Sequence, residues 1–273
     1  MITTSELHRI ANTQGLRFDQ AEKDYVILGA LSAIVAVSDE HTGWVFKGGT
    51  CLRHCYYPGY RFSEDIDFSC IPVRARLASA TALLSRAARA FEDASGLSVA
   101  LKEAKASEGE GQVEIPLEYS RGGGRLRGLP TLRFHLTFDE PLLRLPVKRE
   151  IRPPYADLPP FTIAAYSMVE IVAEKMRALL QQQEKWPRPR DLYDLWFVLC
   201  HRGEKFPKEE LLDLFSRKCA VRGVAPDITG IYSETLREWN RQAWESQLRP
   251  MLTDTPEYAT VWEEWSGFCS AYF

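Results

Sequence analysis

The chain has 273 residues, of which 45% are apolar, and its formal net charge is −3 at pH 7. This apolar content excludes an intrinsically disordered chain, and the nearly neutral balance provides no global field that would draw the protein to nucleic acid or to a membrane. The length is sufficient for two modest domains, or for one domain with a large extension.

Six cysteines are scattered along the chain, and the closest two, Cys51 and Cys55, do not have the spacing of a CxxC site. We therefore expect reduced thiols and no zinc site, which is typical of a cytoplasmic protein. No signal peptide opens the chain, and no apolar run reaches the ~18 residues that a membrane span needs, so we expect no membrane partner.

The first half of the chain has the pattern of a mixed α/β domain. Helices are predicted for residues 4–12, 19–38, 50–57 and 74–95, and the sequence YYPGY ends the third of them. Strands are predicted for GWVFKGG, for DIDFSC, and for residues 97–104, 112–119 and 130–138. In the last of these, alternate residues from Leu132 to Phe138 share one face.

Six prolines lie within residues 140–160, so this segment can be neither a continuous helix nor a central strand. The remaining pattern is helical over residues 166–184, 190–201, 208–220, 228–245 and 256–271. The sequence thus predicts an α+β protein with two domains. Residues 1–160 would form a mixed sheet flanked by helices, and residues 161–273 a helical bundle.

Asp65 and Asp67 are the first candidate site residues. Residues two apart in a strand point to the same face, so the two carboxylates project together while Ile66 and Phe68 enter the core. Two close carboxylates repel and raise each other's pKa unless a cation lies between them. A Mg²⁺ ion held by the carboxylates and by substrate phosphates would resolve this conflict.

Gly48 and Gly49 precede these aspartates at the end of an apolar strand. Because they have no Cβ, their backbone N–H groups can approach a phosphate closely at the start of a helix. A triphosphate bridged between this turn and metal on the aspartates would suit nucleotidyl transfer. The alternative is a glycine hairpin and an edge strand with solvated aspartates, but the order of strand, glycine pair, helix and strand favours the functional interpretation.

Two basic stretches flank this part of the chain. Residues 121–152 hold eight Arg or Lys against three acids, and residues 175–190 hold five against Glu184 alone. They would suit a polyanion that meets a metal at the aspartates. A set of solvated cations is nearly as compatible with the sequence.

The stretch KGGTCLRHCYYPGYRFSEDIDFS, with Arg61, Ser63, Asp65 and Asp67 in register, resembles the opening motifs of the DNA polymerase β-like nucleotidyltransferases. It is most similar to the AbiEii/AbiGii toxin family. The later stretch YSMVEIVAEKMRALLQQQEKWPRPRDLYDLWFVL resembles that family's glutamate–lysine helix, its arginine- and proline-rich break, and its RDLYDLW motif. The matched stretches cover about a fifth of the chain and occur in the expected order.

The resemblance implies a polymerase β-like nucleotidyltransferase domain in a type IV toxin with a role in phage defence. Such an enzyme would transfer a nucleoside monophosphate from an NTP, with Mg²⁺ or Mn²⁺, to an acceptor hydroxyl. The implied acceptor is RNA, at the 3′ end of tRNA, and the implied partner is a cognate antitoxin encoded nearby. The alternatives are nucleotidylation of a protein or a small molecule, and an inactive nucleotide-binding regulator.

The resemblance also implies roles for residues of both domains. It implies metal binding by Asp65 and Asp67, catalysis by these two with Lys175 and Asp191, and nucleotide binding by Lys47, Gly48, Gly49, Thr50, Ser63 and Lys175. The helical domain would contribute Lys175 and Asp191 to the active-site cleft.

Lys175 and Asp191 belong to two predicted helices that are joined at the break WPRP. In a simple hairpin Lys175 lies roughly 16 Å from the break at 1.5 Å per residue, whereas Asp191 lies beside it. We therefore expect no direct contact between them. The residues three and four away from Lys175 are apolar, so no local ion pair accounts for it, while Asp194 and Tyr193 are expected to be structural.

A third metal carboxylate is not evident. The predicted strand 130–138 has His135 on its polar face, where related enzymes often carry an acid. Glu114, Glu118 and Asp139 are the candidates for this ligand, and a site without a third carboxylate is the remaining alternative.

Overall fold

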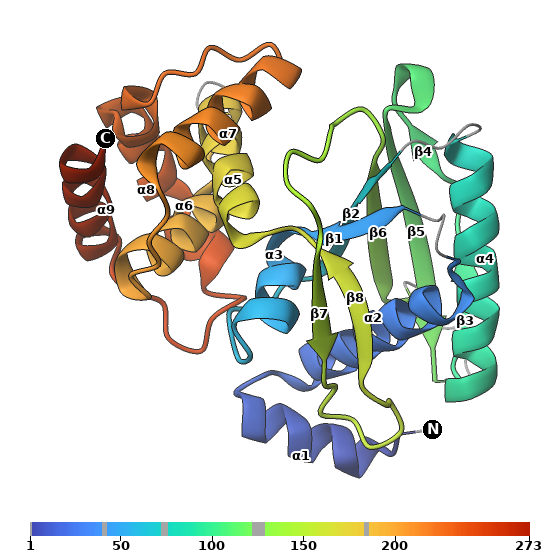
Figure 1. The fold of residues 1–273 in the computed structure, drawn as a ribbon. Coiled ribbons are helices and arrows are strands. Elements are labelled where there is room, and N and C mark those ends of the chain that lie inside the picture. Colours follow the sequence, from blue (N-terminus) through green and yellow to red (C-terminus); the bar gives the residue numbers. More distant parts are fainter. Residues whose placement is uncertain (1, 40–42, 72–75, 122–128, 183–185) are drawn as a thin grey trace. The chain divides into compact units, whose positions relative to one another are not determined.

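The structure is a computed structural model that describes residues 2–39, 43–71, 76–121, 129–182 and 186–273 (Figure 1). The chain forms two compact units, Met1–Tyr166 (unit 1) and Ser167–Phe273 (unit 2). The division falls after Tyr166 rather than after residue 160, because strand β8 (Phe161–Ala165) belongs to the sheet of unit 1.

Unit 1 is built on a mixed sheet of eight strands in the described residues. Its strands follow the order β3-β5-β6-β2-β1-β8-β7, and β4 pairs with β5. The central β2 is antiparallel to β1 and parallel to β6. The other strands are β1 (Trp44–Lys47), β2 (Asp65–Cys70), β3 (Ser98–Leu101), β4 (Lys105–Ala106), β5 (Gln112–Ser120), β6 (Thr131–Thr137) and β7 (Val147–Ile151).

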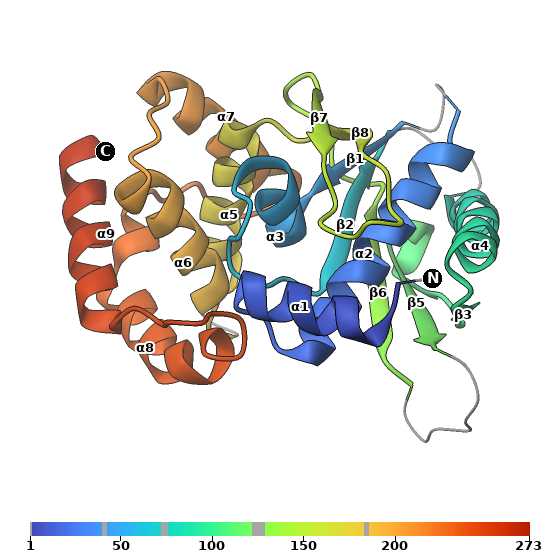
Figure 2. The same cartoon turned by 90° about the horizontal axis from the view of Figure 1, so that it is seen from below.

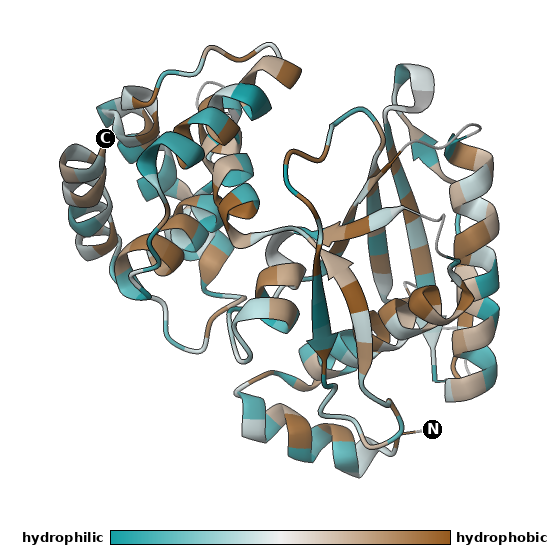
Figure 3. Cartoon of the chain, viewed as in Figure 1, coloured by the Kyte–Doolittle hydropathy of each residue, from teal (hydrophilic) through white to brown (hydrophobic). Residues whose placement is uncertain are grey.

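The core of unit 1 lies on one face of this sheet. Alternate residues of β5 and β6 are buried, and hydropathy alternates along the two strands (Figure 3). The predicted alternation from Leu132 to Phe138 is confirmed as far as Leu136, since β6 ends at Thr137 and Phe138 is only half-buried. Neighbouring strands align these side chains in rows, as where Ile66, Phe134 and Ile115 are successive partners. The residues between these positions point to the opposite face of the sheet, which is therefore available for polar side chains.

Three α-helices of more than one turn accompany the described part of this sheet: α1 (Thr4–Gln14), α2 (Phe18–Val37) and α4 (Arg76–Ser95). Helices α2 and α4 pack together where Gly29 faces Phe91, since a Cβ on Gly29 would lie 2.1 Å from the Phe91 ring. Helix α2 also contacts β6 and β8, and α4 contacts β3 (Figure 2). These helices agree with the predicted helices at 4–12, 19–38 and 74–95.

Three described strands of unit 1 were not predicted: the two-residue β4, and β7 and β8. Strand β7 lies within the proline-rich segment, and β8 follows that segment. The two strands form an antiparallel pair, with β7 at the edge of the sheet. Prolines are tolerated at a sheet edge because an edge strand leaves half of its backbone groups unpaired. Strands β7 and β8 each have only five residues, which is too short for a clear alternation signal.

Unit 2 is helical in its described residues, and it was predicted to be. Helix α5 packs against α6 and α7, and α6 also contacts α8 and α9. A proline in the first turn of α6 suits the helix start, where a backbone N–H is not needed. The α-helices are α5 (Met168–Gln182), α6 (Pro189–Trp196), α7 (Lys208–Val221), α8 (Glu234–Leu248) and α9 (Tyr258–Tyr272). Among the residues described in both units, no helix is long and apolar enough to cross a membrane.

Candidate active site

The glycine turn of unit 1 rests directly on one of the two candidate aspartates. Gly48 has a φ of +80°, a backbone conformation that favours glycine. A Cβ at this position would lie 2.2 Å from Asp67 Oδ2, which is closer than atoms can approach. Glycine is therefore required at position 48 both by the backbone and by the aspartate next to it.

Gly49 and Thr50, the next residues of the turn, contact residues at and just before the start of β2. A Cβ on Gly49 would lie 2.8 Å from Arg61 Nη2 and 2.9 Å from Ser63 Oγ. Thr50 donates its hydroxyl hydrogen to the carbonyl oxygen of Asp65 at 2.5 Å. The helix that begins here, α3 (Gly48–Cys51), continues as a π-helical turn, η1 (Leu52–Tyr56). The turn and the two aspartates thus form one local structure.

Asp65 and Asp67 lie on the polar face of β2, as their spacing predicts. Both are partly exposed, whereas Ile66 and Phe68 between and beyond them are buried. The register puts Asp67 beside Lys47 of β1 on one side and beside His135 of β6 on the other. Two carboxylates from one strand therefore face the same space as the polar residues of its neighbours.

His135 lies among carboxylates. Its Nε2 is 3.8 Å from Asp65 Oδ1 and its Nδ1 is 3.9 Å from Glu114 Oε2, distances of ion pairs rather than of hydrogen bonds. The interaction with Asp65 and the charges of Asp67 and Glu114 raise the pKa of His135 above its usual value, against the opposing effect of burial. A protonated imidazole here partly neutralises the acidic face.

The three candidates for a third carboxylate differ in position. Glu114 is the register partner of His135, so the histidine strand separates it from Asp67. Glu118 pairs with Lys102 at 2.9 Å, and Asp139 lies against Gly111. Among the residues that the structure describes, no three His, Cys, Asp or Glu side chains form a group that could hold a metal ion.

Asp65 and Asp67 nevertheless suit a divalent cation as a pair. Carboxylate oxygens are the ligands that Mg²⁺ prefers, and this ion is commonly held by one or two carboxylates with substrate phosphates and water completing its shell. Because Gly48 has no Cβ, its backbone lies directly against the Asp67 carboxylate.

Lys47 was expected to bind nucleotide, but its side chain is buried. Its Nζ lies 3.7 Å from Glu140 Oε2 and 5.6 Å from the centre of the Tyr166 ring. The Glu140 side chain is also buried, so the two charges compensate each other within the unit.

In unit 2, Lys175 and Asp191 are in direct contact, which corrects the expectation from the hairpin. Lys175 Nζ lies 2.7 Å from Asp191 Oδ1 and 2.6 Å from Asp194 Oδ2. The expected separation assumed that the helix of Lys175 continues to residue 186, but α5 already ends at Gln182. The long lysine side chain shortens the remaining distance to Asp191. The charge of Lys175 is therefore compensated by ion pairs with Asp191 and Asp194, which lie on the next helix, and not by residues of its own helix.

This cluster is charged and buried. Arg188 donates to Asp191 Oδ2 at 2.6 Å, so Asp191 is held by two cations. Burial alone would raise the pKa of Asp191, but the charges of Arg188 and Lys175 outweigh it and hold the pKa well below its usual range. Asp194 is fully buried beside Lys175, and Tyr193 packs against Trp196 and Trp244, in keeping with structural roles.

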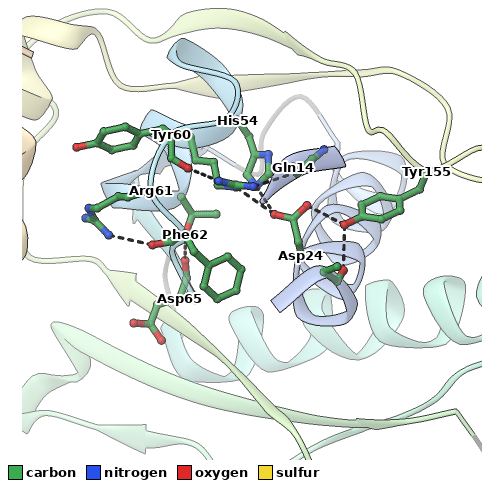
Figure 4. Close-up of polar contacts among 11 residues, drawn as sticks. Gln14, Asp24, His54, Tyr60, Arg61, Phe62, Asp65 and Tyr155 are labelled. Carbon is green, nitrogen blue, oxygen red and sulfur yellow. Dashed lines mark hydrogen bonds and ion pairs between the residues drawn. The ribbon is translucent and has the colours of Figure 1, made fainter. Parts of the chain in front are cut away.

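Two further buried ion pairs were missed by the sequence analysis. Lys218 of α7 is fully buried and lies 2.9 Å from Glu170 Oε1 of α5. Asp24 of α2 is 1% exposed and meets Arg53 of η1 (Figure 4). Of these residues only Glu170 has apolar neighbours on both sides in the sequence, and that pattern does not reveal its partner.

The basic stretches are only partly available to a ligand. Arg121 pairs with Glu22, Arg152 with Glu150, and Arg188 with Asp191. Arg125, Arg127 and Lys185 lie outside the described residues. The stretches therefore contain fewer uncompensated cations than their composition suggests.

Comparison with known families places this site in context. Residues 29–267 match the family described as nucleotidyl transferase AbiEii toxin, type IV toxin–antitoxin system. The match covers most of the chain, so the chain belongs to this family and is a nucleotidyltransferase. The family implies an NTP substrate, usually a divalent metal, and a cognate antitoxin. No curated protein matches the chain.

Solved structures share its mixed α/β fold. MenT4, a nucleotidyltransferase toxin from Mycobacterium tuberculosis H37Rv, has a TM-score of 0.63 and 18% identity, over 99% of this chain and 90% of its own. JHP933 from Helicobacter pylori has a TM-score of 0.54 and 20% identity, over 89% of this chain and 88% of its own. At these identities the similarity shows the fold alone. The predicted family and the mixed sheet flanked by helices are confirmed.

Proposed function

We propose that this nucleotidyltransferase transfers a nucleoside monophosphate from an NTP to an RNA hydroxyl at the 3′ end of tRNA, with Mg²⁺ on Asp65 and Asp67. The observation that carries the proposal is the packing of Gly48 on the Asp67 carboxylate, in a strand where Asp65 shares the same face. A phosphate-binding turn and a pair of metal-binding carboxylates are thereby joined in one local structure.

Each residue of unit 1 has a distinct task in this proposal. The backbone N–H groups of Gly48, Gly49 and Thr50 bind the triphosphate, and Ser63 beside Gly49 donates a further hydrogen bond. Asp65 and Asp67 hold the divalent ion. When bound, such an ion neutralises phosphate charge and increases the acidity of the attacking hydroxyl. Mn²⁺ could replace Mg²⁺ because both prefer oxygen ligands.

We further propose that Lys175 and Asp191 of unit 2 take part in the reaction, with Lys175 contacting the triphosphate. The ion pair between them supports a joint role, and Arg188 keeps Asp191 ionised. The same contacts also fit a purely structural role, in which Lys175 joins α5 to α6. The test must therefore separate lost chemistry from lost folding.

The proposal of an RNA acceptor is based on the positive charges at the protein surface. Phosphate-rich RNA suits the cations that remain on the surface, such as Lys148 and Arg190, which are both exposed. A protein hydroxyl or a small molecule would have no need for them. The cognate antitoxin would act on this transfer reaction.

The test is transfer of label from each α-labelled NTP in turn to total RNA, with Mg²⁺, by the wild-type protein and by Asp65→Asn and Lys175→Met variants. Label in tRNA-sized bands with one NTP, absent from both variants while they remain folded, supports the proposal. Label in protein would retain the active site but reject the RNA acceptor. NTP binding without release of pyrophosphate would reject transfer and favour a regulatory protein.

A further inference from the structure

A buried charge network lies behind the phosphate-binding turn, and none of the roles proposed above uses it. Asp24 is 1% exposed and Arg53 is 3% exposed. Arg53 Nε donates to Asp24 Oδ1 at 3.3 Å, and His54 Nε2 lies 3.2 Å from the same oxygen (Figure 4). Burying charges is unfavourable unless they are well paired, so a fold that contains such a network uses it to fix a geometry or a function.

Arg53 joins three segments of unit 1, two of which lie 29 and 39 residues before it in the chain. Besides Asp24 of α2, its guanidinium donates to the carbonyl oxygen of Tyr60 and to Gln14 Oε1, the latter at 3.2 Å. Figure 4 shows these three partners, Gln14, Asp24 and Tyr60, on different segments of the chain. A planar group with several fixed N–H donors can hold three partners at once, which a lysine ammonium on the same stem cannot reproduce.

The loop that Arg53 holds presents two side chains to the glycine turn. Directly after Tyr60, the buried Arg61 donates to the Phe62 carbonyl at 3.2 Å. Arg61 Nη2 and Ser63 Oγ are the atoms that a Cβ on Gly49 would strike. The backbone position of Tyr60 therefore determines where Arg61 and Ser63 stand beside the turn.

We propose that Arg53, held in place by Asp24, is a positioning residue that sets Arg61 and Ser63 against the phosphate-binding turn. The inference rests on the proposed function, since it takes the turn to be the NTP site. In this role Arg53 touches no phosphate, since each of its three guanidinium nitrogens donates to a protein partner, Asp24, Tyr60 or Gln14.

The matched control is Tyr155, which contacts Asp24 from its other side. The Tyr155 hydroxyl lies 2.9 Å from Asp24 Oδ2 and 2.9 Å from the Ala21 carbonyl oxygen. Tyr155→Phe removes a buried hydrogen bond of Asp24 but leaves every contact of Arg53 in place. It therefore reports what general weakening of the network does without releasing the loop.

The experiment compares Arg53→Lys with Tyr155→Phe in NTP transfer and in equilibrium NTP binding with Mg²⁺. For Arg53→Lys we expect KM and the dissociation constant for NTP to rise about tenfold while kcat stays within about threefold, because the lost interaction serves binding. Tyr155→Phe should leave KM within about twofold. Amide hydrogen exchange over residues 57–63 should quicken at least about fivefold in Arg53→Lys alone.

Two outcomes would overturn the inference. One is unchanged NTP affinity and unchanged exchange over 57–63 in folded Arg53→Lys, and the other is an equal rise in KM for both variants. If Arg53→Lys does not fold, Gln14→Ala removes one of the three partners and must show the same split at smaller size. Wild-type protein that binds no NTP would reject the proposed function, while the exchange measurement would still decide whether Arg53 holds the loop.

Discussion

Carboxylates occur in two contrasting settings in this protein. In unit 1, Asp65 and Asp67 lie on an open sheet face, and the Asp65 side chain is 34% exposed. In unit 2, Asp191 and Asp194 are 12% and 0% exposed, and Lys175 contacts both at hydrogen-bonding distance. The first pair is accompanied by His135 at 3.8 Å and by a further acid, Glu114.

The difference concerns what each region can still bind. The unit 2 cluster balances two buried carboxylates with the buried Lys175 and the half-exposed Arg188. The unit 1 face gathers three acids around one histidine, so a divalent cation would relieve repulsion there. Substitution of a carboxylate in unit 1 should therefore affect function without a loss of stability. Substitution in the unit 2 cluster should affect stability as well.

The largest effect is expected from Asp67→Asn. Removing one of two metal-binding carboxylates should lower transfer by about 10³-fold or more, equivalent to about 4 kcal/mol in the barrier. The free energy of unfolding should not fall, since the neutral amide also relieves repulsion with Asp65. Transfer of labelled NMP and urea unfolding measure the two quantities.

Glu64→Gln is the matched control for Asp67→Asn. Glu64 is adjacent to Asp65 but pairs with Lys23 through a partly exposed contact. Its loss should lower stability by at most about 1 kcal/mol, as for other exposed pairs. Transfer should change by less than about twofold, since Glu64 is not one of the proposed metal ligands. Equal losses in Asp67→Asn and Glu64→Gln would contradict a specific metal role for Asp67.

The next effect is expected from Lys175→Met, and it should appear in stability in addition to the loss of transfer proposed above. Removing the ammonium leaves two buried carboxylates with one cation fewer, which should lower the free energy of unfolding by about 3 kcal/mol. Adding Asp194→Asn should restore part of this loss, because it removes one uncompensated charge. Urea unfolding of the wild type, the two single variants and the double variant tests this, and fully additive effects would show that Lys175 and Asp194 do not interact.

Local patterns in the sequence were sufficient for the elements and for half of the site. Period-two and helical spacing predicted the helices and most strands, and they put Asp65 and Asp67 on one face, because these features depend on neighbours in the chain. The contacts of Lys175 with Asp191, Arg53 with Asp24, and Lys218 with Glu170 join separate helices. Such pairs depend on how elements pack, so the charged partner could not be identified from either segment alone.

A smaller effect is expected from Gly48→Ala, with Gly59→Ala as its control. Both glycines have φ near +80°, so an alanine should lower stability by about 1–2 kcal/mol through backbone strain at either position, and by more at Gly48, where the Cβ also clashes. Only at Gly48 does the new Cβ meet Asp67, whereas no atom lies within 4 Å at Gly59. Transfer should therefore fall about 100-fold in Gly48→Ala and by less than about threefold in Gly59→Ala. Similar activities would remove the link between the turn and Asp67.

The pH dependence of stability should have opposite signs in the two regions. The pKa of Asp191 is lowered in the folded protein, since Arg188 and Lys175 outweigh burial. Its contribution is therefore present above the unfolded value of about 3.9 and is lost as the pH falls below it. Asp191→Asn should reduce the loss of unfolding free energy between about pH 5 and pH 3, measured by urea unfolding.

The smallest effect is expected from His135, whose pKa is raised by Asp65 and its neighbouring acids. Its stabilising contribution is fully present below the unfolded value of about 6.5 and is lost as the pH rises through the raised pKa. Because the side chain is 38% exposed, solvent screening should keep this contribution below about 1 kcal/mol. Urea unfolding of wild type and His135→Gln between about pH 6 and pH 8 should show a decline in the wild type that the variant lacks. A wild type that gains stability relative to the variant over this range would mean that the acids of unit 1 do not act on His135, and the contrast between the two regions would fail at this residue.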